Sequence, residues 1–241
     1  MGIIKTQKEL RLLKKSAVIS NSCIKIIEKS LKEKNISERE IARRIRRNIN
    51  KQGATLSFQT LVASGKRSAM VHPKPHATNQ KINGIGYVDF GARYKGYLTD
   101  VTVPFVKGPV GKKEKRIIEI GLVAYRLALK SIKINEPCWK LHKKIDRFLK
   151  SRGYKIPHNL GHGIGKDVHE RPIIGMPRKK LKGKRLRRWR RIQKIIFQPN
   201  MVFTIEPGIY IKNFGGFRIE NDVLLTSRGL KILTNSRFLK I

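Results

Sequence analysis

Residues 161–172 read GHGIGKDVHERP and place His162 and His169 around a glycine-rich segment. His158 lies four positions before His162, so three of the six histidines fall within twelve residues. Carboxylates next to β-type residues occur on both sides of this stretch, in VDFG (88–91), LTDVT (98–102), FTIEPG (203–208) and FRIEND (217–222). Because imidazole and carboxylate groups are common metal ligands, the combination predicts a dinuclear metal site.

Length and composition indicate a globular protein with one large domain or two small ones. The 241 residues are 39% apolar, which is enough for a hydrophobic core. The N-terminus, MGIIKTQKEL, has no apolar signal region, and no apolar run approaches the roughly 18 residues that span a bilayer. We therefore expect a cytoplasmic protein without a transmembrane segment. Cys23 and Cys138 form no CxxC or zinc spacing and are interpreted as reduced, buried thiols.

The charge of the chain is strongly positive. It carries 55 Lys and Arg against 16 Asp and Glu, a formal net charge of +39. Such a field attracts nucleic acid and anionic surfaces without reading sequence, and the attraction weakens with salt. The segment 178–194, from Arg178 to Lys194, holds 11 of the 55 basic residues, and 44 lie elsewhere. Because the excess extends over the whole chain, it indicates a compositional bias or a polyanionic environment more than a dedicated nucleic-acid function.

Apolar spacing and turn residues predict the order helix, helix, hairpin, helix, helix, hairpin. Capping boxes at 6–9 and 37–40 open two helices, of which the first ends near Asn35 and the second at Gly53. Helical spacing returns at 112–133 and 139–152. Two β-rich runs occupy 86–106, and two more occupy 200–226 around a Gly215-Gly216 turn. The order resembles one αα-β unit used twice, which suggests a pseudo-twofold α/β domain with the site between its halves.

Each predicted hairpin carries two carboxylates, Asp89 and Asp100 in the first and Glu206 and Glu220 in the second. A carboxylate among strand residues is costly to bury unless it is paired or bound to a metal. Four carboxylates and one imidazole suit Mn, Co, Fe or Zn, and they are too many for a single catalytic ion that keeps an open position. Two divalent ions are therefore implied. Water between ions about 3.5–4 Å apart loses its proton near neutral pH, which makes hydrolysis the natural chemistry.

The ordered set DFG, DVT, GHGIGxxxHExP, TIEPG and RIE resembles the pita-bread metallopeptidases, the family of methionine aminopeptidases, Xaa-Pro aminopeptidases and prolidases. The resemblance covers essentially the whole chain and implies a curved, mainly antiparallel sheet with outer helices. It implies that five residues bind metal, with Asp100 and Glu220 bridging the ions: Asp89, Asp100, His162, Glu206 and Glu220. Glu206 would also shuttle the proton, and His169 would stabilise the tetrahedral intermediate.

Features near the site favour the Xaa-Pro branch of this family. His158 in HNLGH resembles a histidine of the Xaa-Pro peptidases and, like His169, would face the substrate. IEPGIY and GGFRIEND also resemble that branch, where Arg218 would orient Glu220. The first expectation is an exopeptidase that hydrolyses an N-terminal Xaa-Pro bond in a dipeptide or a longer peptide. Xaa-Pro enzymes typically carry an N-terminal domain that this sequence is expected to lack. Because its size is that of a methionine aminopeptidase, removal of the initiator methionine is the alternative.

Three departures from the family pattern bear on the site. His72 and His76 compete for one expected substrate-facing position in the loop VHPKPHATNQ (71–80). Asn200 stands where glycine is usual, which is tolerable because Asn visits left-handed turns. A basic insertion, about 173–199, is expected beside the active-site cleft of a single catalytic domain, 1–241.

The basic insertion leaves a second class of function open. With Leu181, Leu186, Trp189 and Ile192 among its cations, it is interpreted either as an amphipathic helix that contacts RNA, a ribosome or a membrane surface, or as a solvated loop. The whole chain could be a binding protein that reuses the fold to dock on RNA or ribosomes. Such a protein would be expected to have lost metal ligands, whereas this sequence keeps all five.

Overall fold

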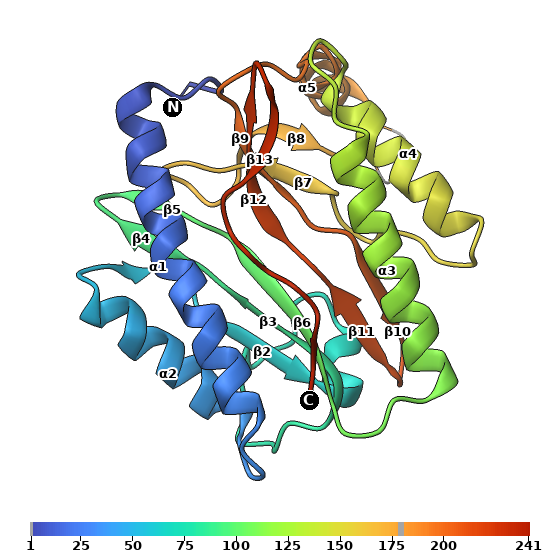
Figure 1. The fold of residues 1–241 in the computed structure, drawn as a ribbon. Helices are drawn as coiled ribbons and strands as arrows, with labels where there is room; N and C mark the ends of the chain where they lie inside the picture. Colours follow the sequence, from blue (N-terminus) through green and yellow to red (C-terminus); the bar gives the residue numbers. More distant parts are fainter. Residues whose placement is uncertain (1, 178–180) are drawn as a thin grey trace.

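Two pairs of long helices flank the β-strands of the protein (Figure 1). The computed structural model describes residues 2–177 and 181–241, so residues 178–180 of the predicted basic segment lie outside the described part. The described helices, with one short 3₁₀ helix at Gly65–Ala69, are α1 Gln7–Leu31, α2 Glu38–Lys51, α3 Lys112–Lys130, α4 Cys138–Lys150 and α5 Gly183–Gln193. The fold is mixed α/β, and its elements follow the predicted order.

Three strands of the first half of the chain and the C-terminal strand β14 form a sheet with the order β14-β6-β3-β2. Its strands are β2 Leu61–Ser64, β3 Gly84–Phe90, β6 Val101–Lys107 and β14 Leu239–Lys240. β3 and β6 pair antiparallel, with Asp89 opposite Thr102. Between them the chain makes a further small hairpin, β4 Ala92–Tyr94 and β5 Tyr97–Leu98, to which β1 Thr55–Leu56 adds an edge strand. The predicted turn between the two β runs is therefore itself a hairpin.

The second half of the chain builds a sheet with the strand order β13-β12-β9-β7-β8. Its strands are β7 Gly161–Gly163, β8 Glu170–Ile174, β9 Val202–Ile205, β12 Asn221–Thr226 and β13 Gly229–Ile232. A separate hairpin, β10 Gly208–Ile211 and β11 Gly215–Arg218, lies between β9 and β12. The turn predicted at Gly215-Gly216 is wrong, because both glycines belong to β11. A Cβ on Gly215 would lie 2.6 Å from Ile85 Cγ2, so this glycine permits close packing of strands instead.

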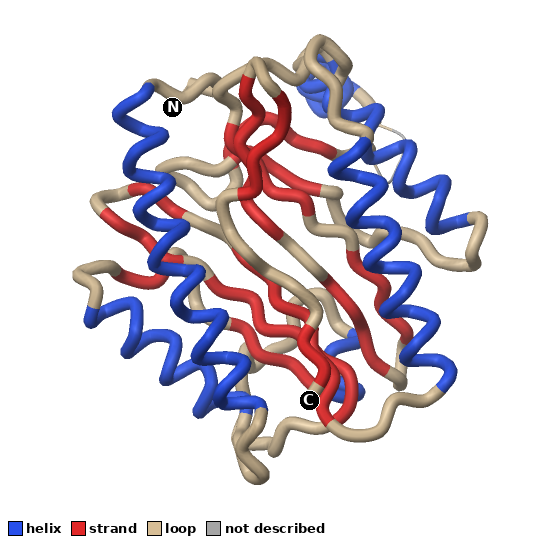
Figure 2. The backbone as a smooth tube through the Cα atoms, in the orientation of Figure 1, coloured by secondary structure: helices blue, strands red, loops and turns tan. Residues whose placement is uncertain are grey.

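The two halves have similar arrangements and meet at the centre of the molecule. In each half an antiparallel pair lies between two further strands: β14 and β2 flank β6–β3, and β13 and β7 flank β12–β9. An isolated antiparallel bridge between Thr102 and Glu220 joins the two pairs. Figures 1 and 2 show α1 and α2 beside the first half and α3 and α4 beside the second. This arrangement agrees with the predicted pseudo-twofold domain.

Local signals in the sequence explain how the helices begin and end. The Thr6 hydroxyl accepts from the backbone N–H of Glu9, and the Glu9 carboxylate accepts from that of Thr6, so the predicted capping box is complete. α1 ends four residues before Asn35, because residues 32–35 form a turn after the helix. Gly53 follows α2 with a φ of +69°, as a C′ glycine should. Asn200 has a φ of 65°, which confirms the predicted left-handed turn.

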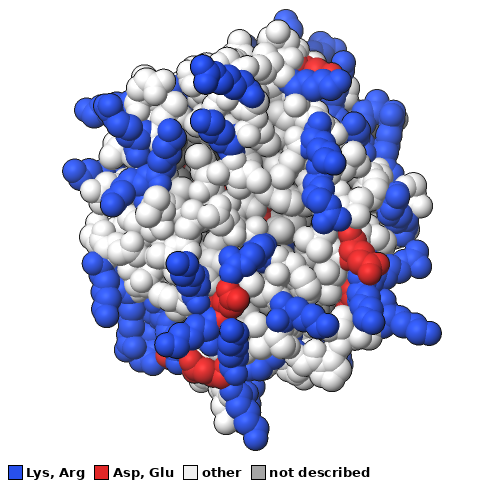
Figure 3. Space-filling model, in the orientation of Figure 1, with Lys and Arg blue, Asp and Glu red and all other residues white. Residues whose placement is uncertain are grey.

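The described part of the basic insertion contains the amphipathic helix α5. Leu186, Trp189 and Ile192 are half-buried and recur at helical spacing, whereas the Lys and Arg side chains between them are exposed. The structure therefore confirms the interpretation of this segment as an amphipathic helix, and the alternative of a solvated loop is wrong for these residues. Lys and Arg side chains are also scattered over the face drawn in Figure 3, with few acidic side chains among them.

Two further expectations concern the thiols and the bilayer. Cys23 and Cys138 are free and buried, as predicted. Burial raises the pKa of Cys23 to about 11 and of Cys138 to about 12, so neither thiol is a reactive thiolate. Among the described residues, no helix is long and apolar enough to cross a membrane.

Candidate metal centre

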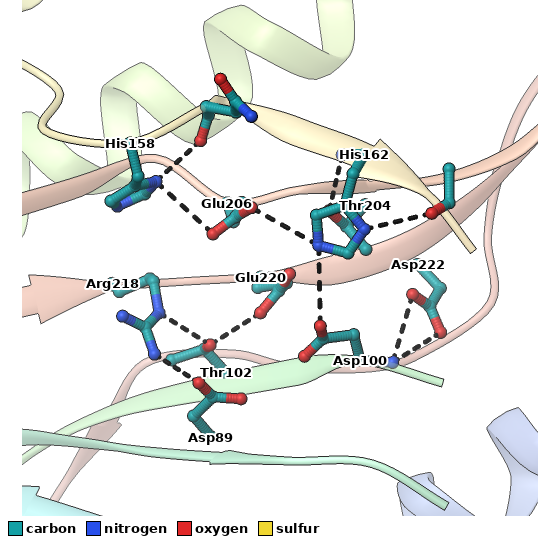
Figure 4. A network of polar contacts seen from close by, with 12 residues as sticks. Asp89, Asp100, Thr102, His158, His162, Thr204, Glu206, Arg218, Glu220 and Asp222 are labelled. Atoms are coloured by element: carbon teal, nitrogen blue, oxygen red, sulfur yellow. Dashed lines mark hydrogen bonds and ion pairs between the residues drawn. The ribbon is translucent and has the colours of Figure 1, made fainter. Parts of the chain in front are cut away.

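The five predicted ligand residues come together where the two strand pairs meet (Figure 4). Asp89 lies near the end of β3, and Asp100 stands immediately before β6. Glu206 follows β9, Glu220 stands between β11 and β12, and His162 is the middle residue of β7. All of these side chains are buried except that of Glu206, which is half-buried. Segments far apart in the sequence therefore contribute to one polar cluster inside the protein.

Short distances connect the members of this cluster. One ligand atom each of Asp100, His162 and Glu220 lie within 4.8 Å of one another, which is close enough to share an ion. His162 Nε2 is 3.6 Å from Asp100 Oδ2 and 3.7 Å from Glu206 Oε1. The neighbouring Asp89 carboxylate is held by a buried arginine, described below. The geometry thus groups donor atoms of the types that divalent ions bind.

Glycines bring the strand that carries His162 against its neighbours. A Cβ on Gly161 would lie 1.9 Å from the carbonyl oxygen of Thr204, and one on Gly163 would lie 2.0 Å from that of Arg171. No other residue fits at such a close approach of two backbones. The backbone N–H of His162 also donates to Thr204 Oγ1 at 3.2 Å. The glycine-rich stretch therefore fixes the depth of His162 in the cluster.

The surroundings of His162 leave its Nε2 able to bind a cation. Its Nδ1 lies 3.1 Å from the Gly163 carbonyl oxygen, which can only accept, so Nδ1 carries the proton. Burial, together with the nearby His169, lowers the pKa of His162 to about 3. The ring is therefore neutral at physiological pH, and its Nε2 lone pair faces Asp100 and Glu206.

Burial and mutual repulsion raise the pKa values of the clustered carboxyl groups. Burial and the charge of Asp89 raise the pKa of Glu220 to about 7. Burial and the charge of Glu220 raise the pKa values of Asp100 and Glu206 well above their usual range. Asp89 Oδ1 and Glu220 Oε1 are also buried without a hydrogen-bond partner among the described residues. The cluster therefore fits divalent cations, whose charge would offset the repulsion and whose coordination would use the partnerless oxygens.

Arg218, which was expected to orient Glu220, contacts Asp89 directly and Glu220 only through a third residue. Its buried guanidinium donates from Nη2 to Asp89 Oδ2 at 2.5 Å and from Nε to Thr102 Oγ1 at 3.0 Å. The Thr102 hydroxyl in turn donates to Glu220 Oε2 at 2.7 Å. Arg218 and Thr102 together therefore fix two carboxylates that lie on different strand pairs.

A chain of hydrogen bonds fixes the ring of His158. Arg218 Nη1 donates to the Tyr210 hydroxyl at 2.9 Å, and this hydroxyl lies 3.0 Å from His158 Nε2. His158 Nδ1 lies 2.7 Å from the Asn159 carbonyl oxygen and 3.5 Å from Glu206 Oε2. Because the carbonyl only accepts, Nδ1 carries a proton and Tyr210 donates to Nε2. The ring is thus held beside Glu206 at the edge of the cluster.

The clustered residues line a cavity of about 370 Å³. The other histidines predicted to face substrate also line it, namely His72, His76, His158 and His169. The ring centre of His169 is 4.4 Å from that of His162. The two histidines that competed for one position, His72 and His76, therefore both reach the cavity. They differ in environment, because His72 is exposed whereas His76 has a buried Nδ1 without a hydrogen-bond partner among the described residues.

Sequence reasoning missed the role of Asp222, the last residue of FRIEND. Asp222 is 1% exposed, and its two carboxylate oxygens lie 3.2 and 3.4 Å from the backbone nitrogen of Asp100. It therefore accepts a hydrogen bond from the residue whose side chain is a candidate ligand. Its position two residues after Glu220 on a strand, where side chains alternate, was the available signal.

Two similar halves that meet around a buried cluster of carboxylates and an imidazole form an arrangement that suits a protein with a metal centre. Residues 11–227 match Metallopeptidase family M24, and the chain belongs to this family. Its fold is the pita-bread fold of its structural neighbours, as expected from the sequence. Metallopeptidases of this family use two divalent metal ions, and the cluster of Asp, Glu and His residues is compatible with them.

Proline peptidases are among the proteins to which the chain is similar. It is 33% identical over 239 residues to a Xaa-Pro dipeptidase of Pyrococcus horikoshii, covering 98% of this chain and 64% of the relative. The prolidase from Pyrococcus furiosus is 32% identical with a TM-score of 0.84, covering 98% of this chain and 66% of that one. An X-Pro aminopeptidase from Thermotoga maritima is 31% identical with a TM-score of 0.85, covering 99% and 65%. The chain thus spans slightly less than two thirds of these relatives.

Proposed function

We propose that this chain is a peptidase that uses two divalent metal ions to hydrolyse the bond before a proline, with Xaa-Pro dipeptides as its first substrates. The observation that carries the proposal is the buried cluster of four carboxylates and a neutral His162, with two partnerless oxygens, beside a histidine-lined cavity. Relatives named Xaa-Pro dipeptidase, prolidase and X-Pro aminopeptidase support the specificity for proline.

The ions would be held by the five clustered residues Asp89, Asp100, His162, Glu206 and Glu220. Bound there, they would polarise the scissile carbonyl and activate a water molecule. Asp100 and Glu220 would bridge the ions, as the resemblance to the family implies, and one donor atom of each lies within 4.8 Å of one of His162. Arg218 and Thr102 are assigned to hold Asp89 and Glu220 in place through the hydrogen bonds described above.

Glu206 is assigned the transfer of the proton. Its carboxylate is half-buried and lines the cavity, within 3.5 Å of His158 Nδ1 and 3.7 Å of His162 Nε2. A carboxylate in this position can take a proton from the activated water and return it to the leaving amine.

The other histidines are assigned to the substrate. His169 lines the cavity next to His162 and would donate a hydrogen bond to the oxygen on which charge develops. His158, fixed through Tyr210, would contact the proline side of the substrate. His72 and His76 lie on the wall of the same cavity and would position the rest of the peptide.

The test is hydrolysis by the metal-loaded protein of Ala-Pro, Gly-Pro, Ala-Pro-Gly and Met-Ala-Gly, with Mn, Co, Fe and Zn compared. We expect cleavage before proline and its loss in His162→Ala and Glu206→Gln. Preferential release of methionine from Met-Ala-Gly would instead assign the chain to the methionine aminopeptidases. Salt-sensitive RNA binding without hydrolysis of any peptide would support the docking protein, and either result would overturn the proposal.

Several expectations from the sequence stay predictions. They are the cytoplasmic location, the assignment of residues 1–241 to one catalytic domain, and the contact of α5 with RNA or ribosomes. The basic helix α5 gives this last contact a surface, because its Lys and Arg side chains are exposed.

A further inference from the structure

A second groove lies next to the active-site cavity, between α2 and the segments 59–60 and 75–77. It has a volume of about 400 Å³. Its basic wall is formed by Arg39, Arg43 and Arg46, which recur at helical spacing along one face of α2. The opposite wall includes Gln59 and Thr60, and no acidic residue lines the groove among the described residues.

The groove and the active-site cavity share a wall. Gln59 lines both of them. His76 lines the cavity, while its neighbours Pro75 and Ala77 line the groove. The backbone N–H of Val62 donates to the His76 carbonyl oxygen at 2.8 Å, which anchors this wall to β2. The groove therefore begins one layer of side chains away from the cavity.

The polar groups of the groove favour an anion. Arg43 is paired with Glu40 at 2.6 Å, whereas the guanidinium groups of Arg39 and Arg46 have no ion pair or hydrogen bond among the described residues. Thr60 is 4% exposed, and its Oγ1 is buried without a hydrogen-bond partner in the described part of the chain. Two unpaired guanidinium groups and a spare hydroxyl match a carboxylate, which accepts several hydrogen bonds.

We propose that this groove binds a carboxylate on the part of a peptide substrate that extends beyond the catalytic cavity, so that the enzyme favours peptides with an acidic residue there. The proposal rests on the peptidase function proposed above and adds a substrate class to it. The guanidinium groups are exposed, so each contact contributes modestly. We expect a preference of about fivefold for the acidic peptide, weakened by salt.

The test compares two peptide amides that differ by one charge, Ala-Pro-Gly-Glu and Ala-Pro-Gly-Gln. The metal-loaded protein should show a ratio of kcat/KM of about five in favour of the acidic peptide, and Arg39→Gln with Arg46→Gln should bring the ratio near one. The matched control is Arg47→Gln with Lys51→Gln, which removes two charges from the opposite flank of α2, where both residues line a different groove. This control should keep the ratio.

Calorimetric binding of the same peptides to the metal-free protein separates this proposal from the peptidase function. Tighter binding of the acidic peptide that depends on Arg39 and Arg46 supports the groove even if neither peptide is hydrolysed, in which case only the peptidase function fails. Equal binding and equal hydrolysis of the two peptides would overturn the groove. An equal loss of preference in the control variant would also overturn it, because the effect would then come from the general positive field.

Discussion

Substitution of Glu220 by glutamine should stabilise the metal-free protein and destabilise the metal-loaded one. Without metal, the Glu220 carboxyl is buried beside Asp89 and its pKa is raised to about 7 from 4.5. Glutamine keeps the size of the side chain and the hydrogen bond from Thr102, but it removes the charge. When metal is bound, the substitution removes one charged ligand from the metal site. The two forms of the protein should therefore rank the two side chains in opposite order.

The magnitude follows from the raised pKa of Glu220. A group whose pKa is higher in the folded state stabilises that state below its unfolded pKa, and the stabilisation is lost as pH rises through the folded value. For Glu220 this stabilisation is lost between pH 4.5 and about pH 7. At 1.36 kcal/mol per pKa unit, the loss is roughly 3 kcal/mol, or about 6–12 °C in Tm for a chain of this size.

The assay is urea and thermal unfolding of both proteins, after complete chelation and after saturation with Mn. At about pH 7.5 metal-free Glu220→Gln should be more stable than the metal-free parent by up to roughly 3 kcal/mol, and the advantage should shrink towards about pH 5. The pKa of His162 is lowered on folding, so its contribution to stability is present above its unfolded pKa of 6.5 and is lost as the pH falls below that value. At about pH 7.5 this contribution is complete, and it does not affect the comparison of the two proteins. Equal stability of the two metal-free proteins at about pH 7.5 would refute the reasoning.

Three further predictions test other parts of the site. Asp222→Ala should weaken Mn binding by about tenfold or more in a metal titration, because the acceptor for the backbone N–H of Asp100 is removed; unchanged affinity would remove Asp222 from the site. His169→Ala should lower kcat on Ala-Pro about 100-fold with little change in metal content, and an equal loss of bound metal would reassign it as a ligand. Gly161→Ala should lower the free energy of unfolding by about 4 kcal/mol or more, because its Cβ meets the Thr204 carbonyl; a wild-type urea midpoint would contradict this packing.

Much of this protein follows from its sequence alone, because the signals involved are local. Capping residues and helical spacing predict where α1 to α4 begin, since these depend on residues a few positions apart. The five ligand candidates stand out because each is a polar group inside a β-type run, where burial without compensation is costly. The left-handed turn at Asn200 was also predictable from a local signal, because asparagine adopts a positive φ more readily than most residues.

The connections between these residues were decided only by the tertiary structure. Thr102 donates to Glu220, 118 positions away, and Arg218 donates to Asp89, 129 positions away, so no local pattern announces either bond. The same holds for Asp222 and the backbone of Asp100, which are 122 positions apart. The sequence determined which side chains could bind metal. Only the packing of the two halves decides which hydrogen bonds hold these side chains, which cavity they line and where the arginine groove lies. The reason is that strands and helices far apart in the chain set the distances between these residues.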